Sequence, residues 1–157
     1  MSELKSERLF GMQVRINAPL DVGATPEGHR MVVVIAGGEF NGPKIEGTIV
    51  PGSGGDWARI RADGSLSIDA RLCLKTADGH LVYMTHIGRF VAASPSEMMK
   101  ILDSTRTASI NPSSYYCRTT ALFETASSKY HWLNGIVGVG AGTFENGGVS
   151  YDIHAVL

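Results

Sequence analysis

The segment SLSIDARLCLK (65–75) alternates strictly between apolar and polar side chains. Ile68 and Leu72 belong to one set, and Asp69 and Arg71 belong to the other. Such alternation predicts a β-strand with two unlike faces. If the polar face lines a cavity, a carboxylate and a guanidinium lie together where they could act on a ligand. If it faces water, the same pair is surface decoration.

Two more segments mix charged or amide groups with aromatic side chains. In YYCRTTALFET (115–125) one predicted face holds Tyr116, Arg118, Thr120, Leu122 and Glu124, and YHWLN (130–134) places Tyr130, Trp132 and Asn134 together. Solvated strand faces are usually rich in Lys, Glu, Ser and Thr, whereas Arg beside acids and aromatics is more typical of a polar pocket. We therefore expect a pocket. Salt bridges on an outer face and an oligomer interface are the alternative.

Asp69, Glu124 and Asp56 are the candidate catalytic residues. Burial raises the pKa of a carboxyl group and a nearby Arg lowers it, so different surroundings could hold one carboxyl as a base and another as an acid. Asp56 ends the glycine-rich segment PGSGGDW (51–57), where it could act as a general base at a barrel mouth. A turn aspartate that bonds its own backbone is the simpler reading of that segment.

The remaining candidates would bind the ligand. Guanidinium groups suit oxyanions, so Arg71 and Arg118 would hold a carboxylate or enolate. The other predicted ligand-binding residues are aromatic or polar: Trp57, Tyr116 and Trp132 for an apolar or aromatic body, and Tyr83 and Asn134 for hydrogen bonds. On one strand Glu124 and Arg118 would be about 20 Å apart. Cross-strand pairs, Glu124 with Arg71 and Arg118 with Asp69, are therefore expected.

Several other classes of function lack sequence support. The chain has a net charge of −1 and a pI near 6.5, which gives no electrostatic case for nucleic-acid or membrane binding. The five histidines show neither HxH nor HExxH spacing, so no metal site is expected, and His86 is more readily a packed residue than a base. No Rossmann, P-loop or GxSxG fingerprint occurs, so no cofactor is expected. A charged start without an apolar leader and two unclustered cysteines favour the cytoplasm.

Turn signals divide the 157 residues into strand-like segments within a single domain spanning residues 1–157. The predicted strands lie near residues 8–16, 30–38, 44–50, 57–62, 66–76, 80–90, 116–125, 132–140 and 149–156. Asp-Gly at 63–64 and 78–79 marks hairpin turns. Eight or nine such strands predict an all-β fold, a closed antiparallel β-barrel whose lumen can hold one small ligand. A two-sheet sandwich is the alternative.

One short helix is predicted near 95–102. Ser94 is a favourable N-cap, Pro95 suits the first helical position, and Glu97 stands where a capping box requires an acid. Residues 103–114 read as a long loop that could form a lid or rim.

These segments resemble the DUF3237 proteins, also called UPF0311, a family of uncharacterised function. The resemblance runs in order through VGATPEGHR (22–30), IAGGEFNGPKIEGTIVPGSGGDW (35–57), IDAR (68–71), DGHLVYMTHIGR (78–89), YYCRTTALFET and YHWLN. It implies a small cytoplasmic barrel, often oligomeric, in which the recurring polar positions correspond to Asp56, Trp57, Asp69, Arg71, Tyr83, Arg118, Glu124, Trp132 and Asn134. Leu72 and Cys117 depart from the aromatic residues that the family often has there, and His29 departs from its common Arg.

Three classes of function remain open. The favoured one is a cofactor-independent enzyme of isomerase, cyclase, lyase or hydratase type, acting on a small, acidic or aromatic organic molecule in the lumen. A non-catalytic binding barrel would use the same residues. In a structural protein, the ion pairs would only fix the barrel. A homo-oligomer is expected in each case.

Overall fold

The computed structural model describes residues 3–103, 110–145 and 147–157. Its elements, in chain order, are β1 (Ser6–Ile16), β2 (Leu20–Thr25), β3 (Gly28–Asn41), β4 (Glu46–Ile49), β5 (Gly55–Asp56), β6 (Arg59–Ile60), β7 (Leu66–Thr76), β8 (Leu81–Ala92), α1 (Pro95–Leu102), the short 3₁₀ helix η1 (Pro112–Ser114), β9 (Tyr115–Glu124), the 3₁₀ helix η2 (His131–Gly135), β10 (Gly138–Glu145) and β11 (Gly148–Val156).

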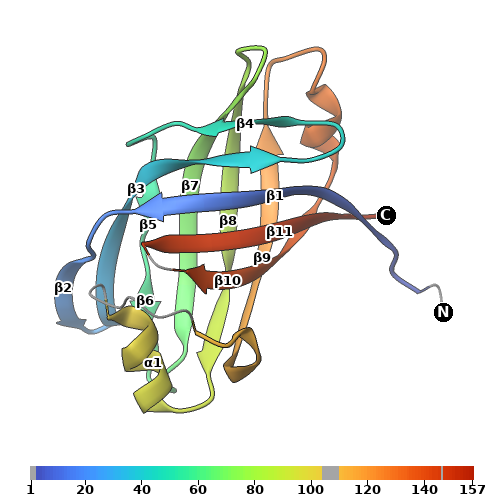
Figure 1. Ribbon diagram of the computed structural model, residues 1–157. Coiled ribbons are helices and arrows are strands. Elements are labelled where there is room, and N and C mark those ends of the chain that lie inside the picture. The colour runs from blue at the N-terminus through green and yellow to red at the C-terminus, as the bar shows by residue number, and fades with distance from the viewer. Residues whose placement is uncertain (1–2, 104–109, 146) are drawn as a thin grey trace.

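The strands close into an antiparallel barrel (Figure 1). Neighbouring strands follow the order β1-β11-β10-β9-β8-β7-β4-β3, and β1 pairs back onto β3 from Gly11–Asn41 to Ile16–Ile35. The ring therefore has eight strands, while β2, β5 and β6 are additions along β3 and β7. This confirms the predicted closed barrel with one short helix. Closure leaves the ring without the open edges that promote aggregation.

The apolar side of each alternating strand faces the interior. In β7, Leu66, Ile68 and Leu72 are buried, whereas the intervening Asp69 and Arg71 keep about two fifths of their side chains exposed. Removing a large aliphatic side chain from water is worth about 1.5–3 kcal/mol, while burying an ion pair costs desolvation energy. The expectation that the polar face of this strand lines the lumen is therefore wrong.

Aromatic and aliphatic side chains fill one half of the barrel interior. Phe10 meets Phe40 and Phe123 edge-on, with ring centroids 5.4 and 6.1 Å apart. Leu133, from η2, is fully buried in the same cluster. The 126–135 segment thus closes this end of the barrel, and any ligand space must lie toward the other end.

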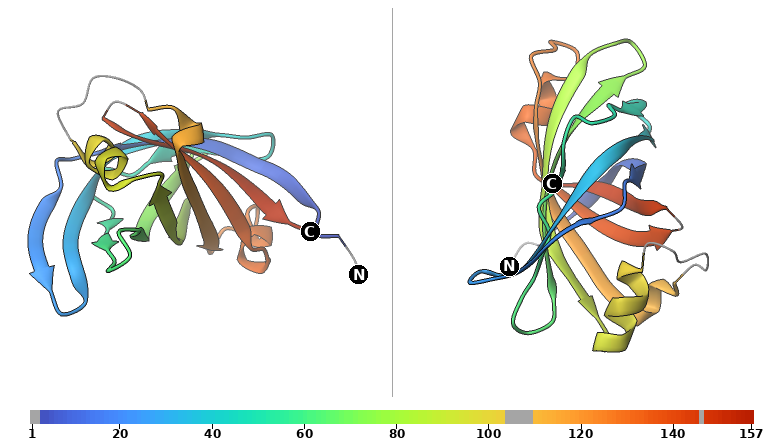
Figure 2. Two further views of the ribbon diagram at one scale, coloured as in Figure 1. Left: turned by 90° about the horizontal axis from the view of Figure 1, so that it is seen from below. Right: turned by 90° about the vertical axis from the view of Figure 1, so that its left-hand side faces the viewer.

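Helix α1 lies at the opposite end of the barrel (Figures 1 and 2). Ser94 accepts a hydrogen bond from the Glu97 backbone N–H at 3.2 Å, which confirms the predicted N-cap. The helix buries Met98 and Ile101 against the barrel and leaves Met99 exposed. None of the helices in the described ranges has the length and apolarity that crossing a membrane would require.

Two predictions about individual elements are wrong. The strand expected at 132–140 begins only at Gly138, because residues 131–135 form η2. The 20–25 segment, not predicted as a strand, pairs with β3 as a hairpin that protrudes from the barrel (Figure 2). Of the loop expected at 103–114, residues 104–109 lie outside the described part, and residues 112–114 form η1.

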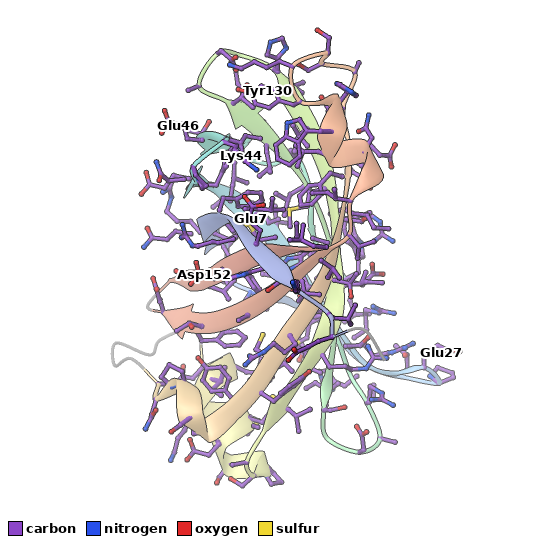
Figure 3. The ribbon with its side chains drawn as sticks, turned by 90° about the vertical axis from the view of Figure 1, so that its right-hand side faces the viewer. Glu7, Glu27, Lys44, Glu46, Tyr130 and Asp152 are labelled. Atoms are coloured by element: carbon purple, nitrogen blue, oxygen red, sulfur yellow. The ribbon has the colours of Figure 1, made fainter. Side chains whose placement is uncertain are left out.

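A hydrogen-bonded carboxylate fixes the packed end. Asp78, in the β7–β8 turn, accepts bonds from Lys129 Nζ at 2.6 Å, Tyr130 Oη at 3.0 Å and Thr76 Oγ1 at 2.6 Å. Tyr130 lies at the end of the barrel remote from α1 (Figure 3). The bond from Lys129, followed by those from the two hydroxyls, holds the pKa of Asp78 far below its usual range. The turn and the 126–135 segment are thereby tied together.

We expect Asp78→Asn to lower the melting temperature at pH 7. The native carboxylate holds its charge at lower pH than the unfolded one, whose pKa is about 4, so its stabilisation is present above that pH and is lost as pH falls below it. The melting-temperature gap between wild type and variant should therefore narrow on acidification, as measured by thermal denaturation followed by circular dichroism.

Asp152→Asn is the matched control, because Asp152 forms an exposed ion pair with Arg8 and such pairs contribute little. A gap for Asp78→Asn that is independent of pH, or no larger than that of the control, would contradict this account of the packed end.

Candidate active site

The unfilled half of the barrel contains a cavity of about 280 Å³ next to α1. Its walls are mainly aliphatic side chains from the inner faces of β1, β3, β7 and β11, and Ile101 and Leu102 of α1 lie at its margin. The polar side chains that line it are few: Asn17, Asp56, His86, Asp103 and Tyr151. A mostly apolar hollow with a small number of polar groups is typical of a site for a small organic ligand.

Asp56 belongs to β5, a two-residue strand inserted between β3 and β7. Its Oδ1 accepts a 2.8 Å hydrogen bond from the Asp69 backbone N–H. Burial raises the pKa of Asp56 to about 6, and the charge of Asp69 adds to the rise, while the bond to the Asp69 backbone and the charge of Arg30 oppose it. The carboxyl group can therefore gain or lose a proton near neutral pH, as a general acid or base requires.

His86 projects into the cavity from the middle of β8 and is only 1% exposed. Its Nε2 is hydrogen-bonded to Thr119 Oγ1 on the adjacent strand β9. The imidazole meets the ring of Tyr151 edge-on, with centroids 4.4 Å apart and an interplanar angle of 74°. Burial lowers the pKa of His86 to about 3, so the ring is neutral at physiological pH.

Tyr151 and Cys117 form the next buried pair. Burial, followed by the nearby Cys117 and Asp56, raises the pKa of the Tyr151 phenol well above its usual value. Burial likewise raises the pKa of the Cys117 thiol to about 11, against the lowering effect of a hydrogen bond with Tyr151. The phenol is therefore a neutral donor, and the thiol is too weakly acidic to act as a nucleophile.

Glycines on the inner face of β10 make room for these groups. A Cβ at Gly140 would lie 2.4 Å from Thr119 Oγ1 and 3.3 Å from His86 Nε2. A Cβ at Gly142 would lie 2.5 Å from Cys117 Sγ and 2.7 Å from Tyr151 Cε1. The alternating glycines of GVGAG thus supply the space that four polar side chains need inside the barrel.

Of the ten predicted site residues, the structure places only Asp56 in the cavity wall. Asp69 and Arg71 lie outside it and form an ion pair of 2.8 Å with each other, and the Arg71 guanidinium lies 5.6 Å from the centre of the Trp57 ring. The other predicted residues that do not line it are Tyr83, Tyr116, Arg118, Glu124, Trp132 and Asn134. The expectation that these faces converge on the lumen is wrong, because the apolar side of each strand occupies the interior.

The expected cross-strand pairs are also not formed. Arg118 stands opposite Arg89 in the β8–β9 register, and Glu124 stands opposite Tyr83. Arg118 instead lies over the ring of Tyr116, with its guanidinium carbon 5.2 Å from the ring centroid.

The YHWLN residues take structural places in η2. Asn134 accepts a bond from the Thr125 backbone N–H at 2.8 Å and donates one to the Thr125 carbonyl at 2.9 Å. Trp132 is half-buried and packs against the core. These side chains therefore fix the 126–135 segment, at the end remote from the cavity.

Sequence reasoning missed Tyr151 and underrated His86. Both stand at inward positions of alternating strands, where their neighbours are apolar. A polar residue within an apolar strand face, opposite a glycine-rich strand such as GVGAG, is the sequence signal that could have identified them.

The outer wall of β8, β9 and β10 carries exposed apolar side chains, and the polar pocket expected from the sequence does not lie there. Ile87, Val91, Tyr116, Leu122 and Val139 lie there, around a shallow depression that also includes Arg89 and Arg118. A larger, more polar depression of about 800 Å³ crosses the outer surface from β4 to β11. Both are open to solvent, whereas Asp56, His86 and Tyr151, whose pKa values burial shifts, line the cavity in the lumen. The expected homo-oligomer stays a prediction.

We expect Gly140→Ala to destabilise the protein by about 1–3 kcal/mol, the usual cost of adding a methyl group at a closely packed position. The added methyl would force Thr119 Oγ1 away from its present position beside His86. Urea denaturation measures the loss. Gly135→Ala is the control, because nothing lies within 4 Å of a Cβ at that position. Equal stability of the two variants would contradict the assigned role of Gly140.

No three His, Cys, Asp or Glu side chains within the described ranges are grouped so that they could hold a metal ion.

A family model described as "Protein of unknown function (DUF3237)" matches residues 4–156. A UPF0311 protein of Rhodopseudomonas palustris is 30% identical over 154 residues, covering 98% of this chain and 97% of that protein.

Solved structures share the fold. A β-barrel-like protein of Acinetobacter baumannii superposes with a TM-score of 0.83 at 31% identity, covering 100% of this chain and 98% of that one. An enzyme from Penicillium herquei superposes with a TM-score of 0.74 over 100% of this chain and 97% of its own, and at 19% identity that likeness shows the fold alone. By its sequence match and its barrel, the chain belongs to the DUF3237 (UPF0311) family, whose function is unknown.

Proposed function

We propose that the protein is a cofactor-independent enzyme that performs acid–base chemistry on a small, uncharged, largely apolar molecule in the barrel lumen. An isomerase, cyclase, lyase or hydratase would use such a site. The observation that carries the proposal is the Asp56 carboxyl, whose pKa burial raises to about 6, in the wall of an apolar cavity. Its second oxygen, Oδ2, has no hydrogen-bonding partner among the described residues and is available to a ligand.

The charge of the lining selects the class of ligand. No residue in the described wall of the cavity is Lys or Arg, because Arg71 and Arg118 lie on the outside. An anionic ligand would therefore give up its hydration without gaining a counter-ion, at a cost of several kcal/mol. We accordingly replace the expected acidic substrate with an uncharged one. A volume of about 280 Å³ suits a compact ring system.

A non-catalytic binding barrel is the second candidate. The predominance of aliphatic side chains in the cavity wall favours it, since they bind without taking part in proton transfer. The two functions differ in whether the Asp56 carboxylate removes a proton from a bound molecule.

The ring-opening elimination of 5-nitrobenzisoxazole tests that difference. In this reaction a base removes the C3 proton, the C–H electron pair forms a nitrile, and the N–O bond breaks to release a coloured phenolate. The probe is uncharged, aromatic and small. We expect the wild-type rate to rise with pH through about 6, because only ionised Asp56 can accept the proton. Absorbance of the phenolate measures the rate.

Asp56→Asn should reduce this rate at least tenfold, within the range attributed to a general base. Glu124→Gln should retain it, because this side chain does not line the cavity. Equal rates for wild type and Asp56→Asn would reject the proposed enzyme. Binding of the probe without accelerated elimination would favour the non-catalytic barrel.

A further inference from the structure

We infer that the lumen takes a carbonyl compound, and that His86 is the donor that binds its carbonyl oxygen while Asp56 faces an adjacent C–H bond. The inference rests on the acid–base function proposed above. It adds the substrate class and a second catalytic residue.

The hydrogen bond between His86 and Thr119 determines where the imidazole proton resides. Thr119 is buried, and within the described ranges its hydroxyl has His86 Nε2 as its sole hydrogen-bonding partner. A buried hydroxyl left without an acceptor is costly, whereas an N–H in the cavity wall can donate to whatever occupies the cavity, so Thr119 donates to Nε2. A neutral imidazole that accepts at one nitrogen carries its proton on the other. His86 therefore holds its proton on Nδ1.

The Nδ1–H group is then left without an acceptor among the described residues. His86 lines the cavity, and none of the described residues accepts a bond from Nδ1. The ring cannot turn freely to find one, because Tyr151 packs against it edge-on and the bond to Thr119 anchors its far side. A donor held in this way inside an apolar cavity is matched by a ligand that supplies an acceptor oxygen and no charge.

A carbonyl group fits both polar elements of the cavity. Its oxygen accepts from His86 Nδ1–H, and the hydrogen on the neighbouring carbon is the one that a carboxylate can remove. Asp56 takes that proton, the C–H electron pair forms a C=C bond, and the C=O π pair moves onto oxygen to give an enolate. The neutral imidazole donates to the enolate oxygen without transferring its proton. Return of the proton from Asp56 to the far carbon of a conjugated enolate completes an isomerisation, and replacement of that proton by one from solvent before its return to the original carbon completes an exchange.

The position of the proton can be measured on the wild-type protein without any ligand. Nitrogen-15 NMR of the histidine side chains distinguishes a protonated Nδ1 from a protonated Nε2. We expect His86 to carry its proton on Nδ1 at pH 7. A proton on Nε2 would overturn the inference, whatever a ligand does.

The uncharged ketone 2-indanone, labelled with carbon-13 at its carbonyl, tests the contact. We expect the carbonyl infrared band of the bound ketone to lie at lower frequency in wild type than in His86→Phe, which keeps a ring against Tyr151 but has no N–H. His86→Phe should also slow exchange of the α-hydrogens with heavy water by about 100-fold, as expected for loss of an oxyanion donor.

Asp56→Asn separates the inference from the proposed function. It should abolish the exchange and leave the shifted carbonyl band in place, because the contact with His86 persists. If Asp56→Asn abolishes exchange but the band is the same in wild type and His86→Phe, the inference fails and the acid–base function stands. If exchange is equal in wild type and Asp56→Asn, the proposed function itself fails.

Discussion

The requirement that one apolar face of each strand leave water determines the rest of this structure. Strand β7 shows it most simply, because its buried Leu66, Ile68 and Leu72 fix the orientation of every residue between them. A shift of one position would exchange the two faces, placing Asp69 and Arg71 in hydrocarbon. The same constraint acts around the closed ring. It makes the outer wall polar at β7 and leaves an interior in which any ionisable group is an exception.

Those exceptions gather in one half of the barrel. The other half is filled by phenylalanine rings and by Leu133, whereas the half near α1 retains a cavity with Asp56, His86 and Tyr151 in its wall. Desolvation favours the uncharged form of each of these three side chains. It raises the pKa values of Asp56 and Tyr151 and lowers that of His86, so that neutral donors face a carboxyl group that titrates near neutrality. Acid–base catalysis needs groups whose pKa values differ from one another within one dry cavity.

The barrel itself could be predicted from the sequence, because alternation, Asp-Gly turns and the capped helix are local signals that agree with the final fold. Which face of each strand points into the barrel is harder to predict. Both faces of the 115–125 strand contain aromatic residues, and composition alone did not show that Cys117, Thr119 and Phe123 point inward. The site depended on two non-local facts: that β5 inserts Asp56 between β3 and β7, and that glycines of β10 clear space across the barrel. No single segment contains either fact.

The most direct test of this account is the pKa of the Asp56 carboxyl group, followed by the carbon-13 NMR shift of its side-chain carbon and assigned by its disappearance in Asp56→Asn. We expect a titration midpoint of about 6, because burial against the lumen raises the pKa of this carboxyl group. A midpoint of about 4, the ordinary value for a solvated aspartate, would show that this carboxyl group is in contact with water and that the lumen holds no desolvated base.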